Sequence, residues 1–368
     1  MKRIKAFIRR EPVLVIAALA AAVSCCFVPP DREYLSYFDL RTLALLYGLM
    51  TVVAGLNRAG LFSRLAGTLC ARAGSVRRLG LMLVLLSFVS SMLITNDVAL
   101  LTFVPFAAAV LVLANRPGEL SRVVVLQTVA ANLGSMLTPV GNPQNLYLYS
   151  RYGFTMGSFL SVTFPLWALS LVLCAAACLL LPAAPLERSP EREAAPMGKR
   201  VWIHAGLFIL CLLTVLRILP WPVMLGCVLL VLLITDRSLL LKADFLLLLT
   251  FAAFFVFSGN LARIPAVSEA LKSLMSGREY GVSLLASQVI SNVPAALLLS
   301  GFTEAGKELV LGVDIGGLGT PIASLASLIS LKLYSRTEGA KPGRFLLEFT
   351  VVNLALLGLL TLAKLLLG

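Results

Sequence analysis

Two short polar stretches, each interrupting an apolar run, have the residue types of an ion-binding site. If each stretch ends one half-helix and begins another, its unpaired carbonyl groups favour a small cation and its unpaired amides favour an anion. Hydroxyl and amide side chains add further oxygen ligands. Capping of a simple kink is the alternative interpretation. The candidate tips consist of Thr95, Asn96 and Asp97 in the first stretch and Ser291, Asn292 and Val293 in the second.

The surroundings of each tip are also duplicated. Between residues 91–101 and 287–297 five positions are identical at a fixed offset, with Ser91, Ile94, Asn96, Ala99 and Leu101 matching Ser287, Ile290, Asn292, Ala295 and Leu297. The segment N-L-G-S-M-L-T-P at 132–139 follows the first tip, and D-I-G-G-L-G-T-P at 314–321 follows the second. Two repeated motifs in the same order predict two related halves. We call the segments 132–139 and 314–321 the first and second echoed segments. In a membrane protein this pattern is typical of a transporter whose site lies where broken segments meet.

A proline-centred break follows each tip. Proline lacks an amide donor and clashes with the preceding helical turn, so we expect each of these helices to split in two. The carbonyl groups freed by such a split can ligate a coupling ion. A plain proline kink is the alternative. The break residues are Thr138, Pro139, Gly141 and Asn142 in the first half and Thr320 and Pro321 in the second.

Two acidic residues fall inside expected membrane segments, Asp97 at the first tip and Asp314 just before the second break. A charged residue at the bilayer centre costs about 2.5–3.5 kcal/mol on insertion scales, which makes each a candidate for binding a cation or a proton. A helix-capping role is the alternative for both. Arg58 and Arg263 occupy similar places in the two halves, where they could reach an anion or extend toward the membrane surface.

The composition requires a membrane protein. The 368 residues are 59% hydrophobic and only 13% charged, whereas soluble domains are about 25% charged. The net charge of +13 does not indicate nucleic acid, because most Lys and Arg occupy short gaps between apolar runs, as the positive-inside rule predicts. The seven cysteines form no C-x-x-C pair, and His204 is the only histidine. We expect no metal cofactor of the zinc type.

The candidate site residues are positioned by apolar runs that are long enough to cross a bilayer, which takes about 20 residues. The segments 79–114 and 282–300 instead contain a central polar break, and we expect them to be re-entrant helical hairpins. Irregular backbone survives at membrane depth only where protein or a watery cavity surrounds it. The expected spans lie near 12–29, 40–57, 119–150, 157–181, 201–219, 220–236, 243–260, 309–334 and 343–367.

The distribution of Lys and Arg favours a cytoplasmic N-terminus in the plasma (inner) membrane. The first hairpin then enters from the cytosol and the second from outside. We expect an N-terminal repeat at 1–181, a Pro-rich cytoplasmic linker at 182–200, and an inverted C-terminal repeat at 201–368. The extra helix 201–219 crosses the membrane once more and so gives the second repeat the opposite orientation. Two amphipathic stretches, 60–78 and 264–278, are expected to lie on opposite membrane surfaces.

Three motifs carry a family resemblance: T-N-D-V-A-L-L-T-F-V-P at 95–105, T-P-V-G-N-P-Q-N at 138–145 and S-N-V-P-A at 291–295. The chain resembles the ion transporter superfamily of divalent anion/sodium symporters, citrate-type permeases, arsenite permeases and NhaD-type sodium/proton antiporters. The resemblance covers about residues 12 to 367. It implies an all-α membrane fold with two inverted repeats, opposed hairpins, broken transmembrane helices and commonly a dimeric elevator mechanism.

The resemblance also implies a sodium site formed by tips and broken helices. If Na⁺ is the coupling ion, its expected site lies near Asn96, Asp97, Asn142, Asn292 and Thr320. In the dicarboxylate branch each tip reads Ser-Asn-Thr, and both tips touch the substrate carboxylates. Here Asp97 and Val293 stand in the third positions. Asp97 would repel a carboxylate, which argues against a dicarboxylate and favours a less-characterised anion permease branch.

We therefore expect a secondary active transporter, not an enzyme, that moves a small inorganic or organic anion coupled to Na⁺ or H⁺. A Na⁺/H⁺ antiporter, favoured by the two acids, an arsenite-type efflux permease and a passive ion channel are the alternatives. A membrane aspartyl hydrolase is disfavoured because its dyad needs adjacent carboxylates, and the acids stand at non-equivalent positions. The expected partners are the transported ion, membrane lipid and a second copy of the chain.

Overall fold

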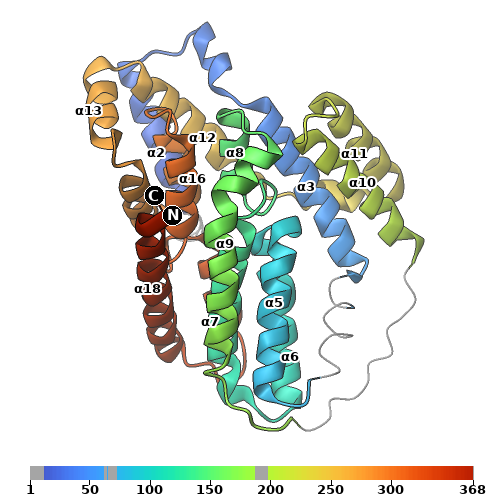
Figure 1. The fold of residues 1–368 in the computed structure, drawn as a ribbon. Coiled ribbons are helices and arrows are strands. Elements are labelled where there is room, and N and C mark those ends of the chain that lie inside the picture. The colour runs from blue at the N-terminus through green and yellow to red at the C-terminus, as the bar shows by residue number, and fades with distance from the viewer. Residues whose placement is uncertain (1–11, 62–63, 65–72, 187–197, 368) are drawn as a thin grey trace, which may run out of the picture.

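The computed structural model describes residues 12–61, 64, 73–186 and 198–367. Across these residues the regular elements are helices, and one isolated bridge pairs Ser75 with Pro185 (Figure 1). The expected all-α class is confirmed. The helices are α2 (Pro12–Phe27), η1 (Arg32–Tyr37), α3 (Leu40–Arg58), α5 (Val76–Ile94), α6 (Asn96–Leu113), η2 (Pro117–Glu119), α7 (Leu120–Ser135), α8 (Pro143–Arg151), α9 (Met156–Cys178), α10 (Lys199–Val215), α11 (Trp221–Thr235), η3 (Arg237–Leu241), α12 (Phe245–Ala262), α13 (Pro265–Met275), α14 (Glu279–Ile290), α15 (Asn292–Leu299), α16 (Gly306–Ile315), α17 (Leu325–Tyr334) and α18 (Pro342–Leu367).

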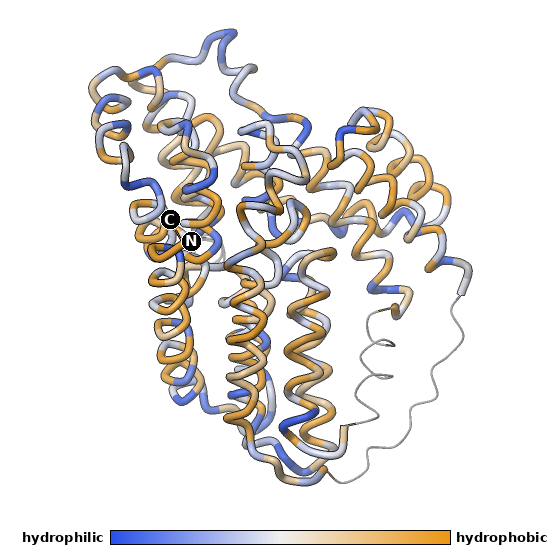
Figure 2. Tube along the Cα trace, in the orientation of Figure 1, coloured by the Kyte–Doolittle hydropathy of each residue, from blue (hydrophilic) through white to orange (hydrophobic). Residues whose placement is uncertain are grey.

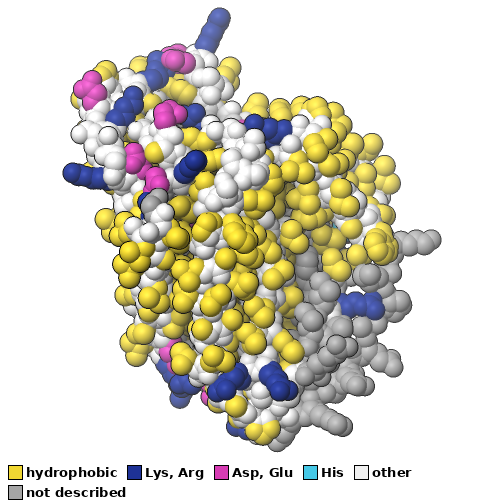
Figure 3. Space-filling model, viewed as in Figure 1, with side chains coloured by type: hydrophobic (Ala, Val, Ile, Leu, Met, Phe, Trp, Pro, Cys, Tyr) yellow, Lys and Arg dark blue, Asp and Glu magenta, His cyan; other side chains and the backbone are white. Residues whose placement is uncertain are grey.

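The helices and the surface have the character of a multi-pass membrane protein. Five described helices, α3, α5, α9, α12 and α18, are long and apolar enough to cross a bilayer. The helices are hydrophobic along most of their length (Figure 2). Hydrophobic side chains cover the middle of the molecule, while charged side chains gather at its ends (Figure 3). Large apolar side chains such as Val351 are exposed over 60% of their surface, as contact with lipid requires.

Both expected hairpins are interrupted at their tips. Helix α5 ends at Ile94 and α6 begins at Asn96, while α14 ends at Ile290 and α15 begins at Asn292. In each pair the two helices pack against each other. The expected spans near 119–150 and 309–334 are likewise each divided, into α7 and α8 and into α16 and α17.

Two groups of helices pack largely among themselves. Helices α3, α10 and α11 contact one another, as do α2 and α12, and α12 also touches α3. Helices α5, α6, α7, α9, α17 and α18 form the other group. Helix α15 contacts α12, and α8 contacts α3, so the two groups meet beside the second tip and the first break.

Some sequence expectations lie wholly or partly outside the described residues. The basic N-terminus precedes residue 12, most of the amphipathic stretch 60–78 is not described, and neither is most of the linker 182–200. The second amphipathic stretch contains α13.

Close contact between α7 and α5 depends on a glycine. A Cβ at Gly134 would stand 2.6 Å from Ser91 Oγ and would overlap the Phe88 carbonyl. The corresponding glycine of the second half, Gly316, has the same relation to α14, where a Cβ would stand 2.9 Å from Ser287 Oγ. In both halves, the broken helix therefore packs directly on the first arm of the hairpin.

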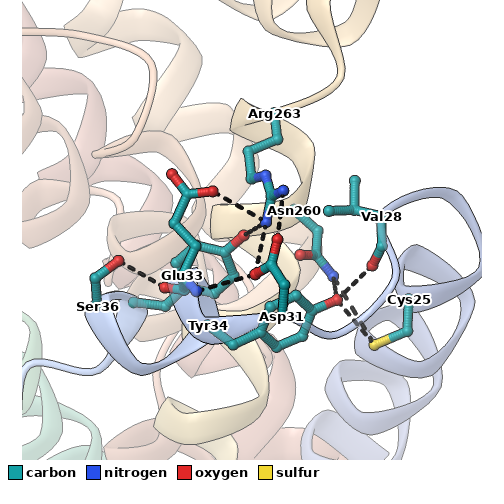
Figure 4. Close-up of polar contacts among 9 residues, drawn as sticks. Cys25, Val28, Asp31, Glu33, Tyr34, Ser36, Asn260 and Arg263 are labelled. Carbon is teal, nitrogen blue, oxygen red and sulfur yellow. Dashed lines mark hydrogen bonds and ion pairs between the residues drawn. The ribbon is translucent and has the colours of Figure 1, made fainter.

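An arginine at the end of α12 fastens the segment that precedes α3. Arg263 donates through Nη2 to Asp31 Oδ2 at 2.7 Å, and Asp31 caps η1 by accepting from the Glu33 amide at 3.0 Å. Asn260 of α12 reaches the same segment by donating to the Tyr34 hydroxyl at 2.8 Å. Figure 4 shows these residues converging between α12 and η1.

We call this ion pair, between an arginine at a helix end and an aspartate that caps a short helix, a clasp. The same clasp occurs with the two halves exchanged. The pattern D-R-x6-D stands at both 31–39 and 236–244, and Arg58 ends α3 much as Arg263 caps α12. Arg58 Nη1 donates to Asp236 Oδ2 at 2.7 Å, and Asp236 caps η3. Each half thus supplies an arginine to the other half. The two arginines therefore form inter-half ion pairs.

We expect Gly134→Ala to lower the melting temperature of the purified protein, because overpacking a tight contact typically costs about 1–3 kcal/mol. Gly206→Ala is the matched control, since a Cβ there meets nothing within 4 Å and alanine favours the helix by about 0.5–1 kcal/mol. Thermal unfolding in detergent, followed by tryptophan fluorescence, measures both. Equal melting temperatures for the two variants would contradict the close-contact assignment.

The clasp at Asp31 predicts a pH-dependent contribution to stability. The hydrogen bond and charge of Arg263 hold the pKa of Asp31 below its ordinary value. A lowered carboxyl pKa stabilises the fold at neutral pH, and this contribution is lost as the pH falls through the folded-state pKa. Asp31→Asn should therefore lower the melting temperature at pH 7 and have little effect in strong acid. Glu338→Gln, at an exposed carboxylate, is the control, and a pH-independent Asp31→Asn effect would argue against the ion pair.

Candidate ion and substrate site

Both tips adopt a backbone conformation that residues other than glycine avoid. Thr95 has φ 71° and ψ 149°, and Ser291 has φ 73° and ψ 153°. Such conformations cost about 1–3 kcal/mol and persist only where the surroundings fix them. Their occurrence at the same place in both hairpins indicates a shared requirement, which is to turn the chain abruptly from one half-helix into the next.

Hydrogen bonds to the following break hold each tip in place. The Asn96 amide donates to the Gly141 carbonyl at 3.1 Å, and the Asn292 amide donates to the Ala323 carbonyl at 2.9 Å. A second pair runs in the opposite direction, from break to hairpin. Thr138 Oγ1 donates to the Met92 carbonyl.

In the second half, Thr320 Oγ1 donates to the Gln288 carbonyl at 3.1 Å. The Gln288 side chain adds to this support, because its Nε2 donates to the Gly316 carbonyl at 2.7 Å and its Oε1 accepts from the Thr320 amide at 3.0 Å. The threonines of the two breaks therefore fix the hairpins.

Both tips face one cavity of about 680 Å³. The starts of α6, α8, α15 and α17 all contribute residues to its wall. Each helix start carries a positive partial charge, although the first amides of α6 and α15 already donate to the breaks. Four such ends around one cavity produce a potential that attracts an anion or the electron-rich oxygen of a neutral solute.

The charged side chains of this wall are acidic. Among the described residues that line the cavity, Asp97 and Asp244 are the only charged ones. Asp244 precedes α12 and caps it by accepting from the Leu247 amide at 2.9 Å. The sequence reasoning missed Asp244, although it is the last residue of the second D-R-x6-D pattern, which would have singled it out.

Asn132 joins the two halves behind the cavity. Its Oδ1 accepts from Asn96 Nδ2 at 3.0 Å and from Ser324 Oγ at 3.0 Å, and its Nδ2 donates to Ser327 Oγ at 3.3 Å. The first tip is thereby tied to the start of α17 in the other half. Asn132 opens the first echoed segment, which is the signal that could have identified it.

Asp314 makes the reciprocal connection. It lies at the end of α16, 3% exposed. Its Oδ1 accepts from Asn142 Nδ2 at 3.2 Å and from Gln144 Nε2 at 3.5 Å, both at the start of α8. Gln144 in turn lines the cavity. The acid is therefore one side chain away from the space that a solute would occupy.

The predicted site residues fall into two sets. The cavity wall contains Asn96, Asp97, Ser291, Asn292 and Val293. The remaining predicted residues are not among those that line the cavity: Thr95, Thr138, Pro139, Gly141, Asn142, Asp314, Thr320 and Pro321. The five residues expected around Na⁺ are accordingly divided, with Asn142 beside Asp314 and Thr320 beside Gln288.

Comparison with known proteins agrees with this architecture. The model of the citrate transporter family, CitMHS, matches residues 4–305. The inner membrane protein YbiR of Escherichia coli K12 is 31% identical over 332 residues, which cover 87% of this chain and 86% of that protein. The uncharacterized transporter MJ0456 of Methanocaldococcus jannaschii is 34% identical over 276 residues, 74% of each chain. The silicon efflux transporter LSI3 of rice, Oryza sativa subsp. japonica, is 32% identical over 146 residues, which are 39% of this chain and 30% of that protein.

These matches confirm the resemblance carried by the tip and break motifs. They also agree with the apolar helices and with a cavity built from broken helices, features that suit a carrier rather than an enzyme. The chain therefore belongs to the citrate transporter family and is a multi-pass membrane protein, a secondary transporter.

Proposed function

We propose that this transporter moves a small anion through the cavity between the two tips, driven by Na⁺ or H⁺. The observation that supports the anion is the convergence of four helix starts on one cavity. Backbone amides at helix starts bind anions without any cationic side chain. The volume of about 680 Å³ lies within the range of small-molecule sites.

We propose that the halves, 1–181 and 201–368, are inverted repeats joined by the linker 182–200. The duplicated tip geometry, the reciprocal tip–break hydrogen bonds and the exchanged clasps support two repeats. Helices α5 and α6 lie in the lower half of Figure 1, whereas α13, which leads into the second hairpin, lies at the top. The two hairpins therefore start from opposite ends of the molecule.

We propose that both hairpins are re-entrant, the first 79–114 from the cytoplasm and the second 282–300 from outside. Helix α5 is long enough to cross a bilayer, so its length alone does not make it re-entrant. The support comes from the tips, which both end at one interior cavity. The charged side chains at the lower end of the molecule are mainly Lys and Arg (Figure 3). This excess of positive charge favours a cytoplasmic location for that end.

An elevator mechanism in a homodimer of the inner membrane is part of this proposal. The cavity lies between the tips and helices α2 and α12 of the other packing group, so sliding one group against the other would carry a bound solute. The two clasps lie within the group of α3 and α12 and would keep it rigid. The E. coli relative is an inner membrane protein by name.

Among anions, small inorganic oxyanions and their weak acids fit this cavity better than dicarboxylates. Val293 supplies no hydroxyl at the second tip, and Asp97 at the first tip repels a carboxylate. A rice relative is named a silicon efflux transporter, which agrees with a small inorganic solute. An arsenite-type efflux permease is therefore a subclass of the same proposal.

A Na⁺/H⁺ antiporter is the second candidate, and one observation favours it. The only charged side chains that the described chain brings to the cavity wall are the carboxylates of Asp97 and Asp244. Carboxylate oxygens are suitable ligands for a hard cation. This candidate needs no anion.

Flux measurements on the full-length protein in proteoliposomes test both candidates. Phosphate, sulfate, arsenite, silicic acid, citrate and succinate are offered with an inward Na⁺ or H⁺ gradient. Gradient-driven uptake of one of them supports the anion transporter. Na⁺-induced pH dye dequenching with no solute uptake supports the antiporter instead. Conduction without a gradient requirement indicates a passive channel.

We expect Asn96→Ala and Asn292→Ala each to abolish transport in this assay, because each removes a polar side chain from the cavity wall at a strained tip. Asn353→Ala is the matched control, since Asn353 is buried in α18 and donates to the Phe349 carbonyl. Size-exclusion profiles report insertion and folding. Wild-type uptake in either tip variant would remove the cavity assignment.

We expect Asp97→Asn to change the pH dependence or the coupling ion of transport, because it removes one of two carboxylates from the wall. Uptake is measured between pH 5.5 and 8.5 with Na⁺ or K⁺ outside. Glu304→Gln, at an exposed loop carboxylate, is the control. A pH profile identical to that of the wild type would reduce Asp97 to a helix-capping residue.

A further inference from the structure

We propose that Asp314 carries a proton in the state described, and that this proton is the ion exchanged during transport. The inference rests on the proposed function for its role in transport, but the protonation itself follows from the surroundings of the carboxyl group. It identifies H⁺ rather than Na⁺ as the coupling ion and assigns it to a residue behind the cavity wall.

The surroundings disfavour a charged carboxylate. Asp314 lies in the last turn of α16, the end of a helix that carries a negative partial charge. Its Oδ1 accepts two hydrogen bonds from Asn142 and Gln144, whereas its buried Oδ2 has no hydrogen-bond partner among the described residues. A buried charge without a counter-ion is strongly unfavourable. A proton on Oδ2 removes the charge.

A second unpaired oxygen lies beside the carboxyl group. The side chain of Asn145 is the third amide that interacts with Asp314. Its Nδ2 already donates to the Met136 carbonyl at 3.3 Å, and its buried Oδ1 accepts no hydrogen bond from the part of the chain that the structure describes. The amide of Asn145 is thus a further neutral neighbour of the carboxyl group and supplies no positive charge. A proton on Asp314 Oδ2 turns an acceptor that lacks a donor into a donor.

The other half contains the neutral counterpart of Asp314. Asn132 opens the first echoed segment as Asp314 opens the second. Asn132 contacts Ser324 and Ser327, which stand in the second half where Asn142 and Asn145 stand in the first.

An asparagine both accepts and donates through its side chain, and so does a protonated carboxyl group, whereas a carboxylate only accepts. The position is therefore built for a neutral group with a donor. Asp314 meets that requirement with a hydrogen that can leave, and Asn132 meets it with hydrogens that cannot.

No charged side chain of the described residues compensates for the loss of this proton. The side-chain interactions of Asp314 are with amides alone. The helices packed against α16 bring other titratable groups. The hydroxyl of Tyr280 points to Thr361, and that of Tyr147 to Ser300. The complete set on these helices and on α16 itself is Arg122 of α7, Tyr147, Tyr149 and Arg151 of α8, Cys174 and Cys178 of α9, Glu279 and Tyr280 of α14, Lys307 and Glu308 of α16, and Arg344, Glu348 and Lys364 of α18.

The proton is connected to the cavity through the start of α8. Asn142 caps α8 by accepting from the Asn145 amide at 2.9 Å, and Gln144 lines the cavity. Loss of the proton draws the donors of both amides toward the new charge. The helix start that faces a bound solute is therefore altered by the protonation of Asp314, which links proton release to solute binding.

Infrared spectroscopy of the full-length protein in lipid tests the protonation without any substrate. The carbonyl band of a protonated carboxylic acid should be present at neutral pH, decline as the pH is raised, and lose a component in Asp314→Asn. Asp97→Asn, at the other intramembrane acid, is the matched control and should retain the Asp314 component. A spectrum that Asp314→Asn leaves unchanged would overturn the proposal.

Thermal unfolding supplies a second readout and discriminates H⁺ from Na⁺. Asparagine resembles the protonated acid in shape and charge. The melting temperature of Asp314→Asn should therefore equal that of the wild type at acidic pH and exceed it at alkaline pH, because there the folded wild type must either keep a buried charge or take up a proton. The contradicting result is a wild type that NaCl stabilises and choline chloride does not, together with an Asp314→Asn variant that NaCl does not stabilise. That result would show that Asp314 binds Na⁺ rather than a proton and would overturn the assignment.

Transport then separates the two proposals. In proteoliposomes, Asp314→Asn should exchange solute at equal pH but lose accumulation driven by a pH gradient. If the wild type moves none of the solutes, the proposed function fails, while the infrared result still decides whether Asp314 is protonated. If Asp314→Asn accumulates solute with the pH gradient as well as the wild type does, Asp314 is not the coupling residue.

Discussion

Unpaired backbone groups cannot be left facing lipid, and this constraint shapes the centre of the molecule. Each hairpin turns at a strained residue, Thr95 or Ser291, and each broken helix exposes amides and carbonyls. The hairpin tips and the helix breaks satisfy each other's backbone groups, because the amide that begins α6 or α15 donates to a carbonyl of the adjacent break. The remaining helix starts face a cavity, where a solute can complete their hydrogen bonding.

The supports of the site are duplicated, whereas its chemistry is not. Tip geometry, tip–break hydrogen bonds, glycine contacts and clasps all occur in both halves. The acids at the first tip and before the second break have no acidic counterpart in the other half. Asp97 has Val293 as its counterpart, and Asp314 has Asn132. The backbone supports of the cavity are therefore repeated, while these two acids each occur once.

Neighbouring segments of one half also reach into the other. Asn132 contacts the start of α17, Asp314 contacts the start of α8, and each clasp joins the end of one long helix to a segment of the opposite half. Such exchanged contacts make the halves interdependent. Each tip is held by the break of its own half, but neither half alone would complete the cavity wall or a clasp.

The sequence alone determined the class of the molecule, the positions of its breaks and the identity of both tips. Composition requires lipid as solvent, and the polar interruptions at 95–97 and 291–293 stand out because apolar residues surround them. A repeated motif is visible in one dimension, so the prediction of two related halves and the resemblance to a transporter superfamily both come directly from the residues.

Only the tertiary structure decided which polar residues face the cavity and which stand behind it. Thr138 and Thr320 look like ligands in the sequence but bond to hairpin carbonyls, whereas Asp244 lies far along the chain and still lines the wall. Asn132 gained its role from contacts with a helix of the other half. The physical reason is that backbone amides and carbonyls form most of the site, and their direction depends on how distant segments pack, which residue types do not record.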